Sequence, residues 1–268
     1  MCELFAMTAA RPATVRYELD AFAAEGGERH ANRDGWGIMF AEDRDAHVFR
    51  EASPAADSPL ARMVIEREIA CRHLMAHVRR ASHGRPLLAN THPYTRVHCG
   101  RAHHFAHNGT LGGIEDVPEA QAVKAERVGD TDSELAFLIL LARLSRANAT
   151  SDEARIDAFA AFAADMRALG DANFLFFDGH TLFVHADRRR FEMPDGLTEP
   201  REPGLVMRRF DREDAPREWH ASGPRVRDLP PQTIVFASVP LDDGNWEGLP
   251  RGTVLALRDG AIVGRREG

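Results

Sequence analysis

The chain of 268 residues contains few cysteines, almost no lysine and no long apolar run. Its three cysteines, Cys2, Cys71 and Cys99, cannot form a disulfide framework and leave an odd thiol, which is typical of a reducing compartment. No stretch reaches the roughly 18 consecutive apolar residues of a membrane span. No basic region followed by an apolar segment opens the chain, so we expect no signal peptide. Together these absences predict a cytoplasmic protein.

Positive charge is also scarce, because 34 Lys and Arg residues face 41 Asp and Glu residues, for a net charge of −7. Nucleic acids and membrane surfaces are acidic and select basic proteins, so this balance argues against both as partners. Lys124 is the only lysine, which we attribute to coding bias. The hydrophobic content of 44% with 28% charged residues is ordinary for a globular protein with a substantial core.

Hydrophobic patterns predict many strands around one central pair of helices. Alternating or continuous apolar segments predict strands at 2–9, 74–78, 104–107 and 233–239, and hairpins at 35–49, 174–185 and 254–263. Helical spacing and capping residues predict helices at 14–24, 58–68, 131–145 and 152–169. We predict one layered α+β domain over residues 1–268. The polar stretch 187–231 is expected to be a surface excursion, with disorder as the alternative.

Cys2 directly follows Met1 and precedes the apolar residues Leu4, Phe5 and Met7. If Met1 is removed, Cys2 carries a thiol and a free α-amine on one residue. Their ordinary pKa values, ~8.5 and ~8, are close enough that proton exchange between them costs little. An N-terminal amine paired with a nucleophilic side chain is one way of activating that nucleophile. The structural alternative is a small buried residue of the first strand.

Two polar stretches follow predicted strands or turns. The first, 76–84, leads from an apolar strand into a turn that contains Arg79, Ser82 and His83. An arginine at a strand end is usually a surface residue, but it can also grip a carboxylate through two parallel hydrogen bonds. The second stretch, 90–93, is by itself typical of a simple turn.

Two further polar stretches lie downstream, at 107–110 and 129–134. Asn108-Gly109 is a common turn pair, yet its side-chain amide and backbone N–H could converge on one oxygen. Such an oxyanion hole stabilises a tetrahedral intermediate, and losing one donor costs about 2.7–4 kcal/mol. The stretch 129–134 is an acidic helix start that needs no catalytic explanation, although a carboxylate held there could bind an ammonium group.

Together and in this order, Cys2 and these four stretches resemble the glutaminase domain of the class II glutamine amidotransferases, which are N-terminal nucleophile hydrolases. The resemblance extends to the small stand-alone bacterial members through Asp34-Gly35-Trp36-Gly37 and the segment 237–241, which is followed by Trp246. It covers most of the chain and is weak at 187–231. The fold that it implies is a four-layer α/β/β/α sandwich with two stacked antiparallel sheets.

The resemblance also implies a mechanism. Cys2 would attack the side-chain amide of glutamine while its α-amine shuttles the proton, and Asn108 with the N–H of Gly109 would hold the oxyanion. Arg79 would clamp the substrate α-carboxylate, and Asp132 would pair with the α-ammonium. Three more residues would surround the same end of the substrate: Ser82, His83 and Thr131. The resulting γ-glutamyl thioester would be hydrolysed to glutamate after release of ammonia, with no metal or organic cofactor.

Three functions remain open at this point. The chain could deliver ammonia from glutamine to a separate synthase, because no second, ammonia-using domain is expected in it. It could instead hydrolyse another γ-glutamyl amide, as does the stand-alone relative that trims a γ-glutamyl group in ergothioneine synthesis. The third alternative is a metal-binding or non-catalytic regulatory protein. It rests on a group of potential ligands that lie close together in the sequence: His92, His98, Cys99, His103, His104 and His107. These residues lack the tight paired spacing that is usual for a zinc site.

Overall fold

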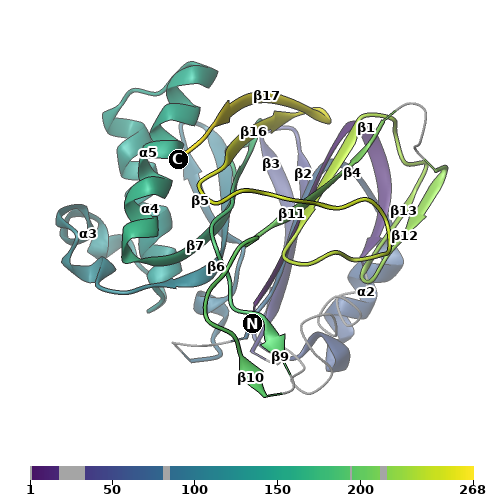
Figure 1. The fold of residues 1–268 in the computed structure, drawn as a ribbon, viewed down its shortest axis with the longest axis horizontal. Helices are drawn as coiled ribbons and strands as arrows, with labels where there is room; N and C mark the ends of the chain where they lie inside the picture. The colour runs from purple at the N-terminus through teal and green to yellow at the C-terminus, as the bar shows by residue number, and fades with distance from the viewer. Residues whose placement is uncertain (1, 18–33, 81–84, 194, 212–215) are drawn as a thin grey trace.

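The computed structural model describes residues 2–17, 34–80, 85–193, 195–211 and 216–268. Two antiparallel sheets are stacked face to face (Figure 1). The first sheet has the strand order β15-β11-β14-β1-β4-β2-β3, and β13 pairs with both β1 and β12. Its strands are β1 (Glu3–Tyr17), β2 (Trp36–Glu42), β3 (Asp45–Glu51), β4 (Ile69–Val78), β11 (Val206–Phe210), β12 (Glu218–His220), β13 (Pro224–Arg227), β14 (Thr233–Ala237) and β15 (Glu247–Gly248).

The second sheet has the strand order β17-β16-β8-β7-β6-β5. Its strands are β5 (Tyr94–His98), β6 (Arg101–Leu111), β7 (Gly170–Phe177), β8 (Leu182–His185), β16 (Val254–Arg258) and β17 (Ala261–Arg266). A separate small pair is formed by β9 (Glu192–Met193) and β10 (Gly196–Leu197). The α-helices of the described residues are α2 (Pro59–Arg67), α3 (Pro118–Val123), α4 (Asp132–Arg146) and α5 (Asp152–Leu169).

The strand β1 shows how the sequence builds the layers. Successive side chains of a strand point to opposite faces of its sheet. Leu4 and Ala6 therefore enter the core between the two sheets, whereas Phe5 and Met7 enter the core on the outer face of the first sheet. All of these side chains are fully buried. Residues 4–7 of this strand are thus apolar without interruption because both faces of the sheet are covered there.

Helices cover the two outer faces of the sheet pair. The amphipathic helices α4 and α5 pack on the second sheet, where Phe137 and Phe159 contact Phe176 of β7. On the other side, Ala61 and Val64 of α2 pack into the outer core of the first sheet. Figure 1 shows the resulting order of α4 and α5, second sheet, first sheet and α2. The predicted α+β sandwich with two stacked antiparallel sheets is confirmed.

The predicted short helix at 14–24 is wrong for its first four residues, which belong to β1. Thr14 and Val15 pair with Ala70 and Ile69 of β4, and the segment also pairs with β13. Pairing on both sides satisfies the backbone groups that a helix would otherwise satisfy internally. Residues 18–24 of that prediction lie outside the described residues.

The stretch 187–231 is neither disordered nor a surface excursion throughout, because it contains β9 to β13. Strand β11 pairs with β14 and β13 pairs with β1, so this stretch widens the first sheet. No helix among the described residues is long and apolar enough to cross a membrane. That residues 1–268 form one domain stays a prediction.

Candidate active site

Cys2 lies directly before β1, a central strand of the first sheet. Its Sγ donates to the carbonyl of Arg80 at 3.1 Å and accepts from the backbone N–H of Arg80 at 3.2 Å. Burial raises the pKa of the Cys2 thiol, and the Arg80 N–H and the nearby Arg79 charge only partly offset that increase. The resting thiol is therefore protonated at neutral pH, and a nucleophilic sulfur at this position requires a base.

Asn108 reaches Cys2 from the second sheet, near the end of β6. Its Nδ2 donates to the carbonyl of Cys2 at 2.7 Å and to Oγ of Ser238 at 3.2 Å. Ser238 Oγ also accepts from the backbone N–H of Leu4 at 2.9 Å, so one hydroxyl ties β1 and the Asn108 amide together. An oxyanion role for Asn108 requires that one of its two acceptors be exchanged for the substrate oxygen.

Gly109 occupies a position where no side chain fits. A Cβ atom there would lie 1.7 Å from the carbonyl oxygen of Asp171 and 2.6 Å from Nε2 of His107. The His107 ring is itself fixed between Ser133 Oγ, 2.9 Å from its Nδ1, and the Asp171 carbonyl, 3.0 Å from its Nε2. Glycine therefore lets β6 and β7 approach closely beside the thiol.

Three of the predicted site residues line one cavity of ≈ 700 Å³: Cys2, Asn108 and Gly109. The other described lining residues come from the segments after β4 and at the end of β6, from the junction of α5 with β7, and from the 187–231 stretch. They are Arg80, Thr110, Gly112, Leu169, Gly170, Asp171, Arg188, Arg190, Leu197 and Pro200.

Arg79 and Asp132 are not among the described lining residues of that cavity. The Arg79 side chain is 3% exposed, and its Nη1 lies 3.4 Å from the Asp34 carbonyl and 3.3 Å from the Arg85 carbonyl. Asp132 is the first residue of α4, where its Oδ2 accepts from the N–H of Leu111 at 2.7 Å. Burial raises the pKa of the nearby Tyr94 hydroxyl, and the charges of Arg79 and Asp132 act on it in opposite directions.

Thr131 has a structural contact of its own, because it caps α4. Its Oγ1 accepts from the N–H of Glu134 at 3.1 Å and lies 2.5 Å from the hydroxyl of Tyr94. The Glu134 carboxylate accepts from the N–H of Gly129 at 2.7 Å, outside the helix. Two predicted site residues lie outside the described residues: Ser82 and His83.

Several residues of the site were not identified as such from the sequence. The main chain of Arg80 holds the thiol, and Ser238 holds Asn108. Ser238 belongs to the segment 237–241, which supported the family resemblance, but the sequence indicated no function for this serine. Arg188 and Arg190 line the cavity as well, and they belong to the polar stretch 187–231, for which the sequence indicated no function.

The histidines considered as metal ligands are dispersed. The rings of His92 and His77 pack at a tilt of 48° with centroids 4.2 Å apart, whereas His104 Nδ1 lies 3.0 Å from Thr95 Oγ1 of β5. Within the described parts of the chain, no three His, Cys, Asp or Glu side chains are placed to hold a metal ion.

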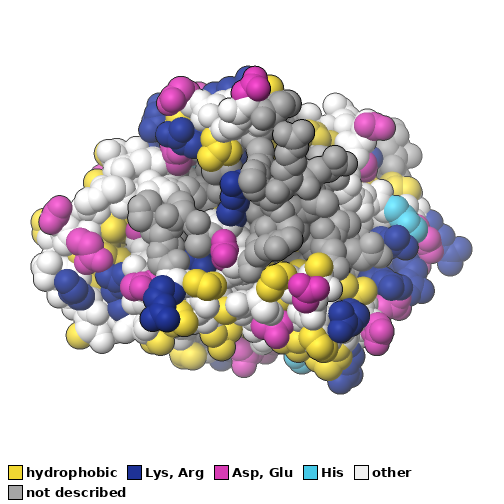
Figure 2. Space-filling model, turned by 90° about the horizontal axis from the view of Figure 1, so that it is seen from below, with side chains coloured by type: hydrophobic (Ala, Val, Ile, Leu, Met, Phe, Trp, Pro, Cys, Tyr) yellow, Lys and Arg dark blue, Asp and Glu magenta, His cyan; other side chains and the backbone are white. Residues whose placement is uncertain are grey.

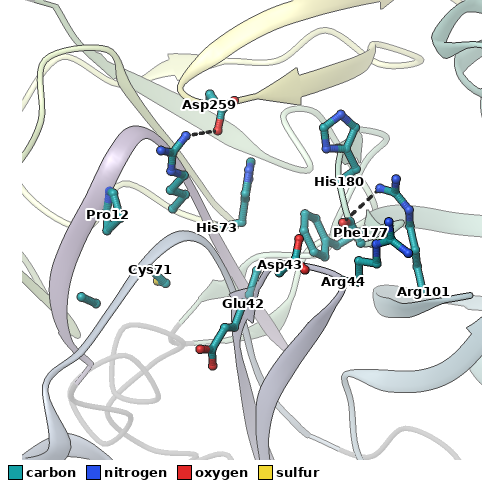
Figure 3. A pocket seen from close by; sticks show the side chains of 14 residues that line it. Pro12, Glu42, Asp43, Arg44, Cys71, His73, Arg101, Phe177, His180 and Asp259 are labelled. Carbon is teal, nitrogen blue, oxygen red and sulfur yellow. Dashed lines mark hydrogen bonds and ion pairs between the residues drawn. The ribbon is translucent and has the colours of Figure 1, made fainter.

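A second cavity, of ≈ 540 Å³, lies at the other end of β1, where Pro12 contributes to its wall. Figure 3 shows Asp43 and Arg44 of the β2–β3 turn on one side of this cavity and Asp259 of the β16–β17 turn on another. Basic and acidic side chains balance there, and Arg72 pairs with Asp259 at 2.9 Å. None of the predicted site residues lines its described part, so the cavity at Cys2 is the candidate active site.

Several known proteins resemble this chain in sequence and in fold. The family model of class-II glutamine amidotransferases matches residues 1–267. YafJ of Escherichia coli, whose name assigns it provisionally to the glutamine amidotransferases, is 34% identical over 188 residues, which cover 69% of this chain and 72% of YafJ. A crystal structure of a predicted glutamine amidotransferase from Pseudomonas aeruginosa superposes with a TM-score of 0.71 at 26% identity, covering 98% of this chain and all of that one.

A more distant structure shares the fold. The glutamine phosphoribosylpyrophosphate amidotransferase of B. subtilis gives a TM-score of 0.58 at 15% identity, with 99% of this chain matched to 49% of that enzyme. With the sandwich, the cavity at Cys2 and a family match over nearly the whole length in agreement, the chain belongs to the class II glutamine amidotransferases.

Proposed function

We propose that this protein is an N-terminal cysteine amidohydrolase that cleaves the side-chain amide of glutamine or of a related γ-glutamyl amide. The observation that carries the proposal is the meeting of Cys2 and Asn108 from opposite sheets at the wall of one cavity. A thiol beside a side-chain amide donor and a close-packed glycine is the arrangement that acyl transfer to sulfur requires.

The reaction begins with a proton transfer. Removal of Met1 frees the α-amine of Cys2, which accepts the thiol proton as the sulfur attacks the amide carbon. Asn108 Nδ2 and the N–H of Gly109 hold the oxyanion of the tetrahedral intermediate. The C–N bond then breaks, the amine leaves with the proton returned by the α-amine, and a γ-glutamyl thioester remains. Water hydrolyses this thioester to glutamate and regenerates the thiol.

Arg79 and Asp132 supply the recognition of the glutamyl group in this proposal. The guanidinium binds the α-carboxylate through paired charge-assisted hydrogen bonds, and the carboxylate of Asp132 binds the α-ammonium. Thr131 lies beside Asp132 at the start of α4, and Ser82 and His83 are assigned to the same end of the substrate on the family resemblance alone. If glutamine is the substrate, the ammonia passes to a separate synthase.

The proposed setting is the cytoplasm, because all three cysteines are free thiols.

The proposal is tested by the release of ammonia from glutamine by the purified protein. We expect Cys2→Ala to abolish the release of ammonia. The unfolding midpoint of this variant should stay close to that of the wild type, because the substitution changes little volume. Cys99→Ala, which removes an exposed thiol, is the matched control and keeps wild-type turnover. Arg79→Ala is expected mainly to raise KM. Wild-type turnover by the Cys2→Ala variant would refute the mechanism.

A second arm tests the α-amine. A chain with a short N-terminal extension that is not removed keeps Cys2 but lacks its free amine. We expect turnover to fall by about 10²–10⁴-fold, which is the usual contribution of a general base. Removal of the extension by a specific protease should restore turnover, and an extended chain that is as active as the processed one would exclude the amine as the base.

A further inference from the structure

We propose that the preferred substrate is a γ-glutamyl amide whose leaving amine carries an acidic group, such as a γ-glutamyl amino acid or dipeptide with a free carboxylate. The inference rests on the proposed function, because it assigns the cavity beside Cys2 to the leaving half of the same substrate.

The charge of the cavity is the first argument. Among its described lining residues are three arginines, Arg80, Arg188 and Arg190, and a single carboxylate, that of Asp171. The described part of its wall thus carries more positive than negative charge, in a chain whose net charge is −7. Figure 2 views the end of the sandwich where the N-terminus, β9 and β10 lie, and it shows one basic patch near the middle of that face with an acidic patch close to it. Clustered arginines beside a reacting centre favour an anionic ligand.

The size of the cavity is the second argument. Ammonia, the leaving group of glutamine, needs about the space of one water molecule, roughly 30 Å³. The cavity measures ≈ 700 Å³, which lies within the range of sites for whole small molecules. A glutaminase does not require such a space next to its sulfur, whereas a larger leaving amine does.

The position of the cavity is the third argument. Its wall contains Cys2, Asn108 and Gly109, but the residues proposed to clamp the glutamyl group, Arg79 and Asp132, are not among its described lining residues. With the glutamyl head bound at the clamp and the amide carbon at the sulfur, the cavity faces the departing nitrogen. The arginines therefore lie where the substituent of that nitrogen would extend.

The individual arginines differ in how firmly they are held. Arg188 is oriented by Asp171, whose Oδ1 accepts from its Nε at 2.7 Å. Arg190 lies at 3.4 Å from the Thr198 carbonyl, a long contact for a group with five N–H donors. Leu197, which is 46% exposed, and Pro200 complete the wall. An acidic leaving amine with a small apolar side chain fits this combination.

The chemical step is that of the proposed function with a larger leaving group. Sulfur bonds to the γ-carbonyl carbon, the C–N bond breaks, and the amino acid leaves as its free amine after taking the proton from the α-amine of Cys2. Water then releases glutamate. No oxidant, reductant or further reactant is needed.

The test compares γ-glutamyl-alanine, which carries a carboxylate, with γ-glutamyl-alaninamide, which is its neutral isostere. Glutamine serves as the reference substrate. We expect kcat/KM for the acid to exceed that for the neutral amide by about tenfold to a hundredfold, the value of a hydrogen bond to a charged group. In Arg190→Gln this ratio should fall at least several-fold, and Arg190→Lys should restore part of it. Arg62→Gln, an exposed charge removed from α2, should leave the ratio unchanged.

Two outcomes would overturn the inference while leaving the proposed function intact. One is equal kcat/KM for the acid and the neutral amide with good turnover of glutamine. The other is an equal loss for all three substrates in Arg190→Gln, which would mean that the cavity arginines bind the glutamyl carboxylate. A protein that turns over none of the three substrates and whose Cys2 is not labelled by a glutamine-like electrophile would instead contradict the proposed function itself.

Discussion

At the scale of single residues, the site depends on the contacts that hold the thiol and the amide beside it. The Cys2 sulfur is held by both backbone groups of Arg80, and the Asn108 amide is held by Ser238. These contacts fix the nucleophile and its neighbouring donor before any substrate arrives. To stabilise a developing oxyanion, the amide has only to exchange one of its two acceptors for the substrate oxygen, so little reorganisation is needed.

Gly109→Ala tests the close approach of β6 and β7. The added Cβ would meet the Asp171 carbonyl at 1.7 Å, so a backbone must move, and we expect a loss of about 1–3 kcal/mol in the free energy of unfolding. Gly112→Ala is the matched control, because its nearest contact would be an ordinary 3.6 Å to the Leu169 carbonyl. Urea unfolding measures both. Equal stability of the two variants would show that the strands can separate without cost.

The ion pair between Glu3 and Arg189 gives a second prediction at this scale. Glu3 follows the nucleophile, and its carboxylate binds Nη1 and Nη2 of Arg189 at 3.1 and 2.7 Å with both side chains almost fully buried. Arg189→Met leaves a buried, unpaired carboxylate and is expected to cost about 3–5 kcal/mol. The double variant Glu3→Leu/Arg189→Met should recover most of this loss.

An exposed ion pair provides the control for that measurement. Arg266 contacts Asp157 at 2.7 Å, with side chains that are 37% and 56% exposed. Arg266→Met should cost less than about 1 kcal/mol. If Arg189→Met cost no more than Arg266→Met, the buried pair would not anchor the N-terminal strand.

At the scale of elements, the start of α4 joins the helix to the site. Thr131 caps the helix and also contacts the buried Tyr94 hydroxyl. Thr131→Ala removes a cap, worth about 0.5–2 kcal/mol, and leaves the tyrosine without that contact. Ser151→Ala removes only the cap of α5. We expect the first variant to lose about 1 kcal/mol more than the second in urea unfolding, and equal losses would contradict a role for the Tyr94 contact.

Elements with local signals were predictable from the sequence. The helix predicted at 152–169 matches α5, because Ser151 caps its start and Gly170 follows its end. The hairpin predicted at 35–49 matches β2 and β3, which pair antiparallel on either side of a charged turn. The extension of β1 through Tyr17 was not predictable in this way, since it depends on pairing with β4 and β13, which are distant in the sequence.

The residues of the site also differ in whether a local sequence signal predicted them. Cys2, Asn108 and Gly109 were predicted from short motifs, and the structure brings them to one cavity. Ser238 and the arginines of 187–231 act at the site only through the tertiary fold. Long-range pairing, such as that of β11 with β14, places them there, and no local spacing reports it.

At the scale of the whole molecule, the sandwich buries many histidines as neutral rings. Burial lowers the pKa of His77 to about 3 and that of His73, His103, His104 and His185 to about 4. In the unfolded chain these groups bind protons below their ordinary pKa of about 6.5. The unfolded state therefore takes up more protons than the folded state as the pH falls from 6.5 towards 4, and stability is lost over that window.

We expect the free energy of unfolding to fall by on the order of 1 kcal/mol per buried histidine for each pH unit below 6.5. Above that pH the contribution of these histidines is fully present. Urea unfolding at pH 7.5, 6.5 and 5.5 measures the trend. A midpoint that is constant over this range would contradict the burial of neutral rings.

The central claim is that the sulfur of Cys2 is the nucleophile and that a glutamyl group binds beside it. It is tested most directly by treating the purified protein with a glutamine analogue that bears an electrophilic carbon in place of the amide, followed by intact mass and peptide mapping. We predict one adduct per chain, on Cys2 of chains that lack Met1, and protection by excess glutamine. Labelling of Cys71 or Cys99 alone, with Cys2 unmodified in chains freed of Met1, would contradict the account.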